Sequence, residues 1–344
     1  MAVDRPLVAV IDAVARELPD LREAADLARL VEVTGVEELE VHLPDLEAVF
    51  AWNFDRGTLR DLVPRAPRLR WIQSISAGVE DLVTPALAAH GVVLTSAAGV
   101  YDAGLAESVL GFLLTFSTRI LEDARLEPGA WPQDGTRLLR GTTVLVVGAG
   151  SIGSEVGRLL KAAGLRVRGI ARTPRPADGV FETIAGVEGL QSELARANHV
   201  VNVLPITEAT RGLFDAEAFA AMRSDAVFVN IGRGATVDEE ALIAALEQSR
   251  IGGAALDVFE VEPLPVESPL WRMPNVLVSP HRAGDHERWA DDVVALFVDN
   301  LKRFVAGQPL RNVVDVELGY APKNRSPAAG TVTQEAPAAA PPRG

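Results

Sequence analysis

Three polar residues in the second half of the chain have the side-chain types that acid–base chemistry on a carboxylic acid requires. Arg233 lies between two glycines, Glu262 precedes a proline, and His281 follows one. A guanidinium binds a carboxylate with two parallel hydrogen bonds, which a lysine cannot do. A carboxylate beside an imidazole favours the protonated ring and raises its pKa. Hydride exchange between a nicotinamide and a 2-oxo acid needs such a set, so we predict that these three residues are catalytic.

A glycine-rich segment supplies the site for the nicotinamide cofactor. The apolar run 144–147 leads into Gly-x-Gly-x-x-Gly, and a helical pattern follows until Gly164. The first glycine of such a motif permits a tight turn, the second lets a pyrophosphate approach the backbone, and the third lets helix and strand pack. Within a strand–helix–strand unit the motif predicts dinucleotide binding. The residues assigned to this loop are Gly148, Gly150, Ser151, Ile152 and Gly153.

The end of the next strand predicts which dinucleotide binds. Ala171 occupies the position where an acidic residue would hold a ribose 2′-hydroxyl, and Arg172, Thr173 and Arg175 follow it. Without a carboxylate to repel a 2′-phosphate, and with two arginines to bind it, NADP(H) is favoured over NAD(H). NAD(H) remains the alternative, in which these arginines belong to a solvated turn.

The catalytic candidates follow apolar strands that alternate with helical patterns, which predicts an α/β fold with a parallel, doubly wound sheet. Ligands bind at the carboxyl ends of such strands, where three adjacent loops would converge. Further, weaker strand patterns in the first hundred residues predict a second, smaller α/β domain. Two long amphipathic helices are expected, one from Leu105 to Ile120 and one from Trp289 to Phe304. The expected strands are 7–11, 48–52, 70–73, 92–94, 143–147, 166–171, 200–204, 226–231, 253–258 and 275–279.

The order of these elements predicts an inserted domain. We expect a Rossmann-type cofactor domain at residues 99–284, inserted into a flavodoxin-like substrate domain formed by residues 1–98 and 285–320. The chain would cross back after the central sheet, so that its last helix packs on the first domain. Residues 321–344 are rich in alanine and proline without a hydrophobic period, which predicts a disordered tail.

Composition excludes several other kinds of site. The 344 residues carry 33 basic and 47 acidic side chains, a net charge of −14 that disfavours binding to nucleic acid or an anionic membrane. There is no cysteine, which excludes disulfides and thiolate metal sites, and no metal is expected. Without a signal peptide or a long apolar span, the cytoplasm is the default expectation.

Many short motifs, in the same order along the chain, resemble those of the D-isomer-specific 2-hydroxyacid dehydrogenase family. The similarity covers the chain up to about residue 316. Besides the glycine loop, the matching stretches are 71–73, 76–80, 106–107, 204–207, 210–213, 230–234, 256–259, 262–264, 268–270 and 280–281. The resemblance implies that Arg233 binds the carboxylate and polarises the keto oxygen, that His281 is the acid and base, and that Glu262 pairs with His281. It also implies that backbone amides of Ala77, Gly78 and Val79 receive the substrate carboxylate.

The remaining cofactor-site residues are expected on neighbouring strand ends. They are Leu204, Pro205, Thr210, Ile231, Asp257 and Gly284. Asp257 is expected beside the nicotinamide rather than as a catalyst. The resemblance further implies a homodimer formed through the segment from Phe112 to Trp131, with two domains that close over a small 2-oxo or 2-hydroxy acid. Trp52 and Trp131 are candidates for lining that site, and packing is the alternative.

Several readings of the function stay open. The short interval between Glu262 and His281, together with Arg172-Thr173, is similar to the glyoxylate/hydroxypyruvate reductase branch of the family. A phosphoglycerate-type dehydrogenase is an alternative, although no C-terminal regulatory domain follows. A nucleotide-sensing, corepressor-like scaffold is a third reading, which a turnover assay would separate from an enzyme.

Overall fold

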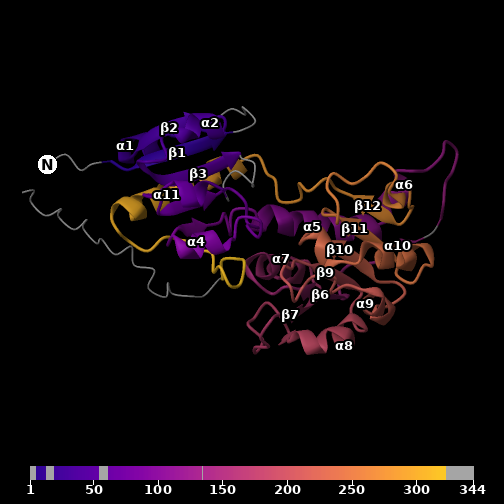
Figure 1. Cartoon of the computed structure of the whole chain (residues 1–344). Helices are drawn as coiled ribbons and strands as arrows, with labels where there is room; N and C mark the ends of the chain where they lie inside the picture. The colour runs from indigo at the N-terminus through magenta and orange to yellow at the C-terminus, as the bar shows by residue number, and fades with distance from the viewer. Residues whose placement is uncertain (1–4, 13–18, 54–60, 134, 323–344) are drawn as a thin grey trace, which may run out of the picture.

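The computed structural model describes residues 5–12, 19–53, 61–133 and 135–322, and within these ranges it contains two parallel sheets (Figure 1). The first sheet has the order β2-β1-β3-β4-β5, and all of its paired strands are parallel. Its strands are β1 (Leu7–Asp12), β2 (Arg29–Val33), β3 (Leu46–Asn53), β4 (Trp71–Ser74) and β5 (Val93–Thr95).

The second sheet is larger and is also parallel throughout. Its order is β12-β11-β10-β9-β6-β7-β8, so the chain starts at β6 and builds outward in both directions, as in a doubly wound sheet. The predicted α/β fold class is confirmed. The strands are β6 (Thr143–Val147), β7 (Arg166–Ile170), β8 (Thr183–Ala185), β9 (His199–Asn202), β10 (Val227–Asn230), β11 (Gly253–Leu256) and β12 (Val276–Val278).

Helices cover both sheets. They are α1 (Arg22–Leu27), α2 (Val36–Glu40), α4 (Pro85–Ala89), α5 (Asp102–Ser117), α6 (Ile120–Asp123), α7 (Ser151–Ala162), α8 (Leu190–Leu194), α9 (Ala216–Ala221), α10 (Glu239–Glu247) and α11 (Trp289–Val305). Short 3₁₀ turns lie at η1 (Val63–Arg65), η2 (Val187–Gly189), η3 (Gly234–Thr236) and η4 (Pro269–Trp271). No helix in the described ranges is both long and apolar enough to cross a membrane.

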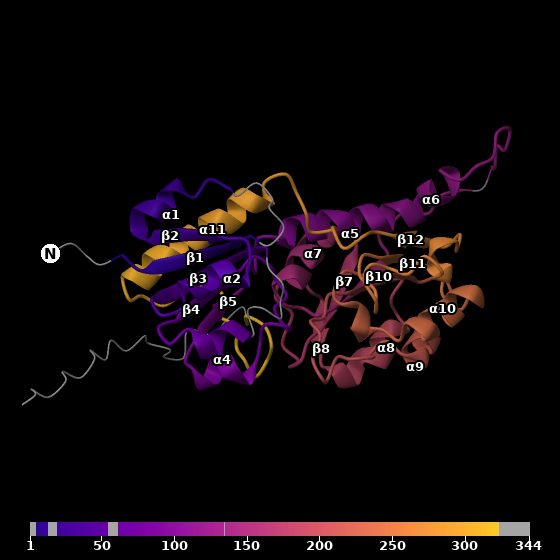
Figure 2. The same cartoon turned by 45° about the horizontal axis from the view of Figure 1, so that its top comes forward.

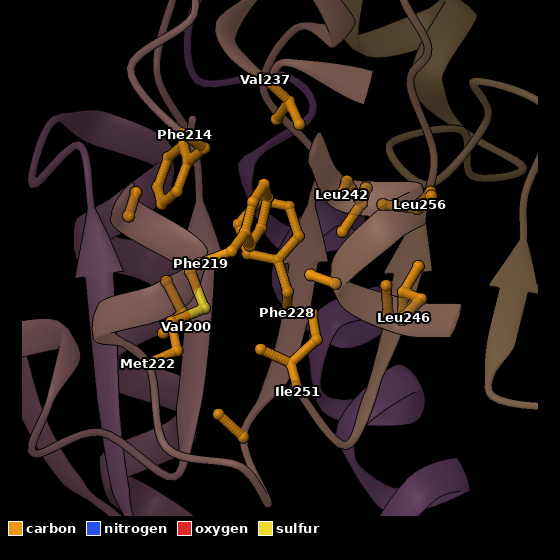
Figure 3. Packing of buried hydrophobic residues seen from close by; sticks show 14 of the residues in the cluster. Val200, Phe214, Phe219, Met222, Phe228, Val237, Leu242, Leu246, Ile251 and Leu256 are labelled. Carbon is orange, nitrogen blue, oxygen red and sulfur yellow. The ribbon is translucent and has the colours of Figure 1, made fainter. Parts of the chain in front are cut away.

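The second sheet is held by an apolar core between its strands and the helices α8 to α10. Figure 3 shows part of it, in which Phe219 and Phe228 meet edge to face with ring centres 5.5 Å apart, beside Phe214. The cluster includes Val200 of β9 and Phe228 of β10, so it supports the strands that lead into the loops described below.

The last helix returns to the first sheet, although it follows the second sheet in sequence. Phe297 of α11 stacks on Phe50 of β3 at 4.1 Å, and Trp289 stacks on Trp52 at 5.3 Å. Figures 1 and 2 both show α11 beside β1 and β3, while α5 runs along the second sheet. The proposed domain boundaries at 98/99 and 284/285 stay predictions, and residues 323–344 lie outside the described ranges.

The sequence analysis missed two edge strands and extended one helix too far. The edge strands β2 and β8 were not predicted, because Glu32 interrupts the apolar run of β2 and Ile184 is the only large apolar residue of β8. The helix expected from Leu105 to Ile120 ends at Ser117, and α6 is separate. Hydroxyls of Ser117 and Thr118 both donate to the carbonyl oxygen of Leu114, and Arg119 has φ of 60°. Such side-chain hydrogen bonds compete with continuation of a helix.

Candidate active site

The three predicted catalytic residues lie in loops after neighbouring strands of the second sheet. Arg233 follows β10, Glu262 follows β11 and His281 follows β12. Nδ1 of His281 is 2.6 Å from Oε2 of Glu262, and the backbone N–H of Phe259 donates to Oε1 of Glu262. The imidazole is therefore paired with a carboxylate that is itself held by the backbone, and half of the His281 side chain is exposed.

The pair shifts the protonation of both partners. The hydrogen bond with Glu262 raises the pKa of His281 above its ordinary value, although burial and the charge of Arg233 oppose the shift. Burial acts to raise the pKa of Glu262, but hydrogen bonds from His281 and the Phe259 amide outweigh it, so that this pKa is lowered. Both shifts favour an imidazolium beside an ionised carboxylate.

Asp257 anchors the loop that carries His281. Its Oδ1 accepts hydrogen bonds from the Ser279 hydroxyl at 2.6 Å and from the Arg282 amide at 3.0 Å. The Ala283 amide lies 3.1 Å from both oxygens, and the His281 amide donates to the backbone carbonyl of Asp257. These contacts give Asp257 a structural part in positioning His281.

A buried polar network positions Arg233. The Asn202 amide donates to Oδ1 of Asn230 and to the hydroxyl of Thr236, and that hydroxyl donates to the carbonyl of Arg233 at 2.6 Å. All three side chains are at most 1% exposed. The sequence analysis did not assign Asn202, whose only signal is a polar residue at the end of the buried strand β9, or Thr236, which lies in the 3₁₀ turn η3.

The glycines around Arg233 are required by close backbone approaches. A Cβ at Gly234 would lie 1.9 Å from the carbonyl of Phe259, and one at Gly232 would lie 2.7 Å from the carbonyl of Leu204. Contacts below 3.0 Å force neighbouring atoms to move. The Arg233 loop thus packs directly on the loop that carries Glu262.

The Arg233 guanidinium reaches across to the loop after β4 of the first sheet. A Cβ at Gly78 would lie 1.3 Å from Nη2 of Arg233, so the guanidinium lies directly over this glycine. Nε of Arg233 donates to Oε1 of Glu80, and Nη1 donates to the carbonyl of Gly232 at 2.7 Å. Ala77 is half-buried, and Val79 is buried in the core of the first sheet. Glu80 was not assigned from the sequence.

The glycine loop has the shape that a dinucleotide requires. Gly148 has φ of 110°, a conformation that favours glycine, and a Cβ at Gly153 would lie 2.1 Å from the Gly148 carbonyl. Nothing lies within 4 Å of a Cβ at Gly150, so the backbone there is open to a pyrophosphate at the N-terminus of α7. These residues fit the predicted cofactor. The Ser151 hydroxyl donates to Asp102 at 2.6 Å, a contact that the sequence analysis missed.

The segment after β7 lies beside the glycine loop. Nη2 of Arg175 donates to the carbonyl of Ala149 at 2.7 Å, while Arg172 and Thr173 are exposed. The guanidinium carbon of Arg172 is 6.0 Å from the ring centre of Tyr320, which comes from the C-terminal segment that follows α11. Two arginines therefore lie at the strand end where a cofactor ribose is expected.

The other residues that were predicted to bind the cofactor lie around the same strand ends, but they make different contacts. The Thr210 hydroxyl donates to the Pro205 carbonyl, which closes the loop that follows Leu204, and Ile231 is buried directly after β10. Gly284 packs against α5, where a Cβ at Gly104 would lie 2.7 Å from its carbonyl. Ile152, the second residue of α7, is half-buried and packs against the core of the second sheet. In the described ranges, no three histidine or acidic residues are placed to hold a metal ion.

The two tryptophan candidates lie apart. Trp52 is buried and stacks on Trp289, so the packing alternative is correct for it. Trp131 is 86% exposed in the segment after α6, which projects from the molecule in Figure 2.

Comparisons with known proteins show which sequences and structures this chain resembles. Residues 110–283 match the family model described as the NAD-binding domain of D-isomer-specific 2-hydroxyacid dehydrogenases. The chain is 36% identical over 265 residues to a glyoxylate/hydroxypyruvate reductase B of Escherichia fergusonii, covering 75% of this chain and 81% of that protein. It is similar to an NADPH-dependent glyoxylate/hydroxypyruvate reductase from Sinorhizobium meliloti in complex with NADP and sulfate, with 30% identity, a TM-score of 0.78, and coverage of 92% and 100%. A dehydrogenase from Xanthobacter autotrophicus in complex with NADPH shows 33% identity, a TM-score of 0.77, and coverage of 91% and 99%.

Proposed function

Because this chain belongs to the D-isomer-specific 2-hydroxyacid dehydrogenases, a family of nicotinamide-dependent oxidoreductases, we propose that it reduces small 2-oxo acids such as glyoxylate or hydroxypyruvate. The observation that carries the proposal is the 2.6 Å contact between His281 and Glu262. These residues follow β12 and β11, and β11 neighbours β10, which leads into the Arg233 loop. The names of the reductases from Escherichia fergusonii and Sinorhizobium meliloti support the substrate class.

Each residue of the site has a distinct part in this reaction. The guanidinium of Arg233, together with the backbone amides of Ala77 to Val79, holds the substrate carboxylate and polarises the keto oxygen. With the pyrophosphate of the dinucleotide bound at the glycine loop, its nicotinamide would supply the hydride. His281 gives its proton to the carbonyl oxygen as that oxygen becomes a hydroxyl, and Glu262 stabilises the protonated imidazole beforehand. Oxidation of the 2-hydroxy acid uses the same groups in reverse.

NADP(H) is the cofactor that this site favours. Ala171 presents no carboxylate to a ribose 2′-phosphate, and the exposed Arg172 lies at the end of β7 beside Tyr320. Arg175 is hydrogen-bonded to the Ala149 carbonyl, so its charge also lies at the glycine loop. The neighbours from Sinorhizobium meliloti and Xanthobacter autotrophicus were solved with NADP and NADPH.

Initial rates test both parts of the proposal. The purified protein is assayed with NADPH and with NADH against glyoxylate, hydroxypyruvate, pyruvate and 3-phosphohydroxypyruvate. We expect turnover of the first two, with NADPH preferred. Arg172→Ala should reduce that preference by about tenfold to a hundredfold, because each charge-assisted hydrogen bond contributes about 1.5–3 kcal/mol. Binding of NADPH without oxidation by any oxo acid would instead support a scaffold, and a clear preference for 3-phosphohydroxypyruvate would support the phosphoglycerate type.

We also infer that two copies associate through the segment near α6. Ile120, Leu126 and Trp131 are exposed there, and an apolar set on a projecting segment is typical of a surface that another protein covers. A cytoplasmic location stays a prediction.

A further inference from the structure

The contact between Glu80 and Arg233 joins the two sheets at the candidate active site. Glu80 belongs to the loop after β4, whereas Arg233 belongs to the loop after β10, and the two residues are 153 positions apart in sequence. Their side chains are 17% and 26% exposed, which makes this pair one of the less exposed ion pairs among the described residues.

The guanidinium is held on three sides. Nε donates to Oε1 of Glu80, Nη1 donates to the Gly232 carbonyl, and Nη2 lies over Gly78, where a Cβ would be 1.3 Å away. Oε2 of Glu80 also lies 2.9 Å from that Cβ position. The Gly232 contact comes from the loop of Arg233 itself, whereas the Glu80 and Gly78 contacts both come from the other sheet.

We propose that Glu80 is a positioning residue that turns the Arg233 guanidinium toward the amides of Ala77 to Val79. A long arginine side chain has many rotamers, and orientation of a binding group contributes strongly to catalysis. Glu80 fixes the Nε side of the guanidinium, so the carboxylate-binding N–H groups stay over Gly78. Because the acceptor and the guanidinium come from different sheets, Arg233 is oriented only when the loops after β4 and β10 meet. This inference depends on the proposed function, since it specifies how that site binds its substrate.

Three variants separate orientation from charge. Glu80→Ala removes the acceptor and the charge, Glu80→Gln keeps an oxygen at the Oε1 position without the charge, and Glu80→Asp keeps the charge but withdraws it by one methylene. Orientation through the hydrogen bond predicts that Gln retains most of the activity, whereas Ala and Asp lose kcat/KM for glyoxylate by about tenfold to a hundredfold. Glu267→Gln removes an exposed charge outside the site and is the matched control.

Binding measurements exclude a general structural effect. The dissociation constant of oxamate, a 2-oxo acid analogue that accepts no hydride, is measured by calorimetry with NADPH present. It should rise in Glu80→Ala and Glu80→Asp in parallel with KM, and it should stay near the wild-type value in Glu80→Gln. The dissociation constant of NADPH and the melting temperature should match those of Glu267→Gln in all three variants.

Several results would overturn the proposal. These are a Glu80→Ala enzyme within twofold of wild type, a Glu80→Gln enzyme as impaired as Glu80→Ala, or equal weakening of oxamate and NADPH binding. If Glu80→Ala does not fold, the comparison of Gln with Asp decides between orientation and charge. Wild-type protein that turns over none of the oxo acids would contradict the proposed function instead, which is a separate outcome.

Discussion

The hydrogen bond between Glu262 and His281 predicts a pH effect on activity. The raised pKa of His281 keeps the proton donor charged at a higher pH than a free imidazole would allow. Reduction should therefore decline as pH rises through this raised pKa. Glu262→Gln removes the negative charge and should move the declining limb of kcat/KM to lower pH. The profile is measured with glyoxylate and NADPH, with the exposed neighbour variant Glu260→Gln as control, and the same limb in both variants would contradict the pairing.

Gly78 offers a test of the contact with Arg233. In Gly78→Ala the new methyl group would occupy the position of Nη2, so the guanidinium must move away from the amides that bind the carboxylate. We expect kcat/KM for glyoxylate to fall by about a hundredfold, since displacement of a binding group by about 1 Å can cost that much. NADPH affinity should be unchanged. Gly111→Ala in α5 has open space around its Cβ and should retain full activity.

The sequence shows the acid–base residues but not the groups that hold them. Arg233, Glu262 and His281 each stand in a motif with glycine or proline, and such local patterns are visible in one chain. The contact of Arg233 with Glu80 joins residues 153 positions apart, and no local pattern predicts that pairing. Asn202 and Thr236 were missed for the same reason, because their parts depend on the adjacency of β9 and β10.

Two glycines of the cofactor loop have different roles in the unit formed by β6 and α7. One permits close packing of the helix on the strand, and the other leaves room for the cofactor. Gly153→Ala places a Cβ 2.1 Å from the Gly148 carbonyl, so α7 must shift from β6, and the free energy of unfolding should fall by about 1–3 kcal/mol. Gly150→Ala has open space and should keep the wild-type melting curve. It should nevertheless weaken NADPH binding, because the methyl group faces the region where the pyrophosphate is expected. Thermal denaturation and quenching of protein fluorescence by NADPH measure the two effects, and equal stability losses would contradict this division.

Prediction of the elements from sequence succeeded where burial was complete. The strands β6, β9, β10 and β11 are buried at every residue, and their continuous apolar runs made them visible. The edge strand β2 was missed, since Arg29 and Glu32 interrupt its apolar pattern. The break after α5 was also missed, because the apolar spacing continues through Ile120 while the backbone turns at Arg119. The spacing of apolar residues indicates which face of a helix is buried, but it does not show at which residue the helix ends.

Exposed apolar residues near α6 predict the oligomeric state of the whole molecule. Replacing Leu126 and Trp131 with serine should convert a dimer into a monomer, because it removes two large apolar side chains from the projecting segment. Sedimentation equilibrium measures the mass of each protein. Exposed Val266, which lies outside this segment, supplies the control variant Val266→Ser, and that variant should remain dimeric. A wild-type protein that sediments as a monomer would contradict the inferred association.

Buried His199 predicts how the whole fold responds to acid. The side chain begins β9, is 7% exposed, and has no hydrogen-bond partner for either ring nitrogen within the described ranges. Burial lowers its pKa from 6.5 to about 4, and the charge of Asp225 opposes the shift. Since the folded protein disfavours the proton that the unfolded chain accepts, this contribution to stability is complete above pH 6.5. As the pH falls from there toward 4, stability should be lost at about 1.4 kcal/mol per pH unit.

Comparison with His199→Leu isolates this effect from every other titrating group, because those groups are common to both proteins. Urea unfolding at pH 8 gives the baseline difference in free energy between the two proteins, where the imidazole is neutral in both folded and unfolded wild type. Between pH 8 and 5 the wild type should lose about 2 kcal/mol more than the variant. A constant difference across that range would mean that His199 accepts a proton in the folded protein as readily as in the unfolded chain. The start of β9 would then be open to solvent rather than packed as the structure has it.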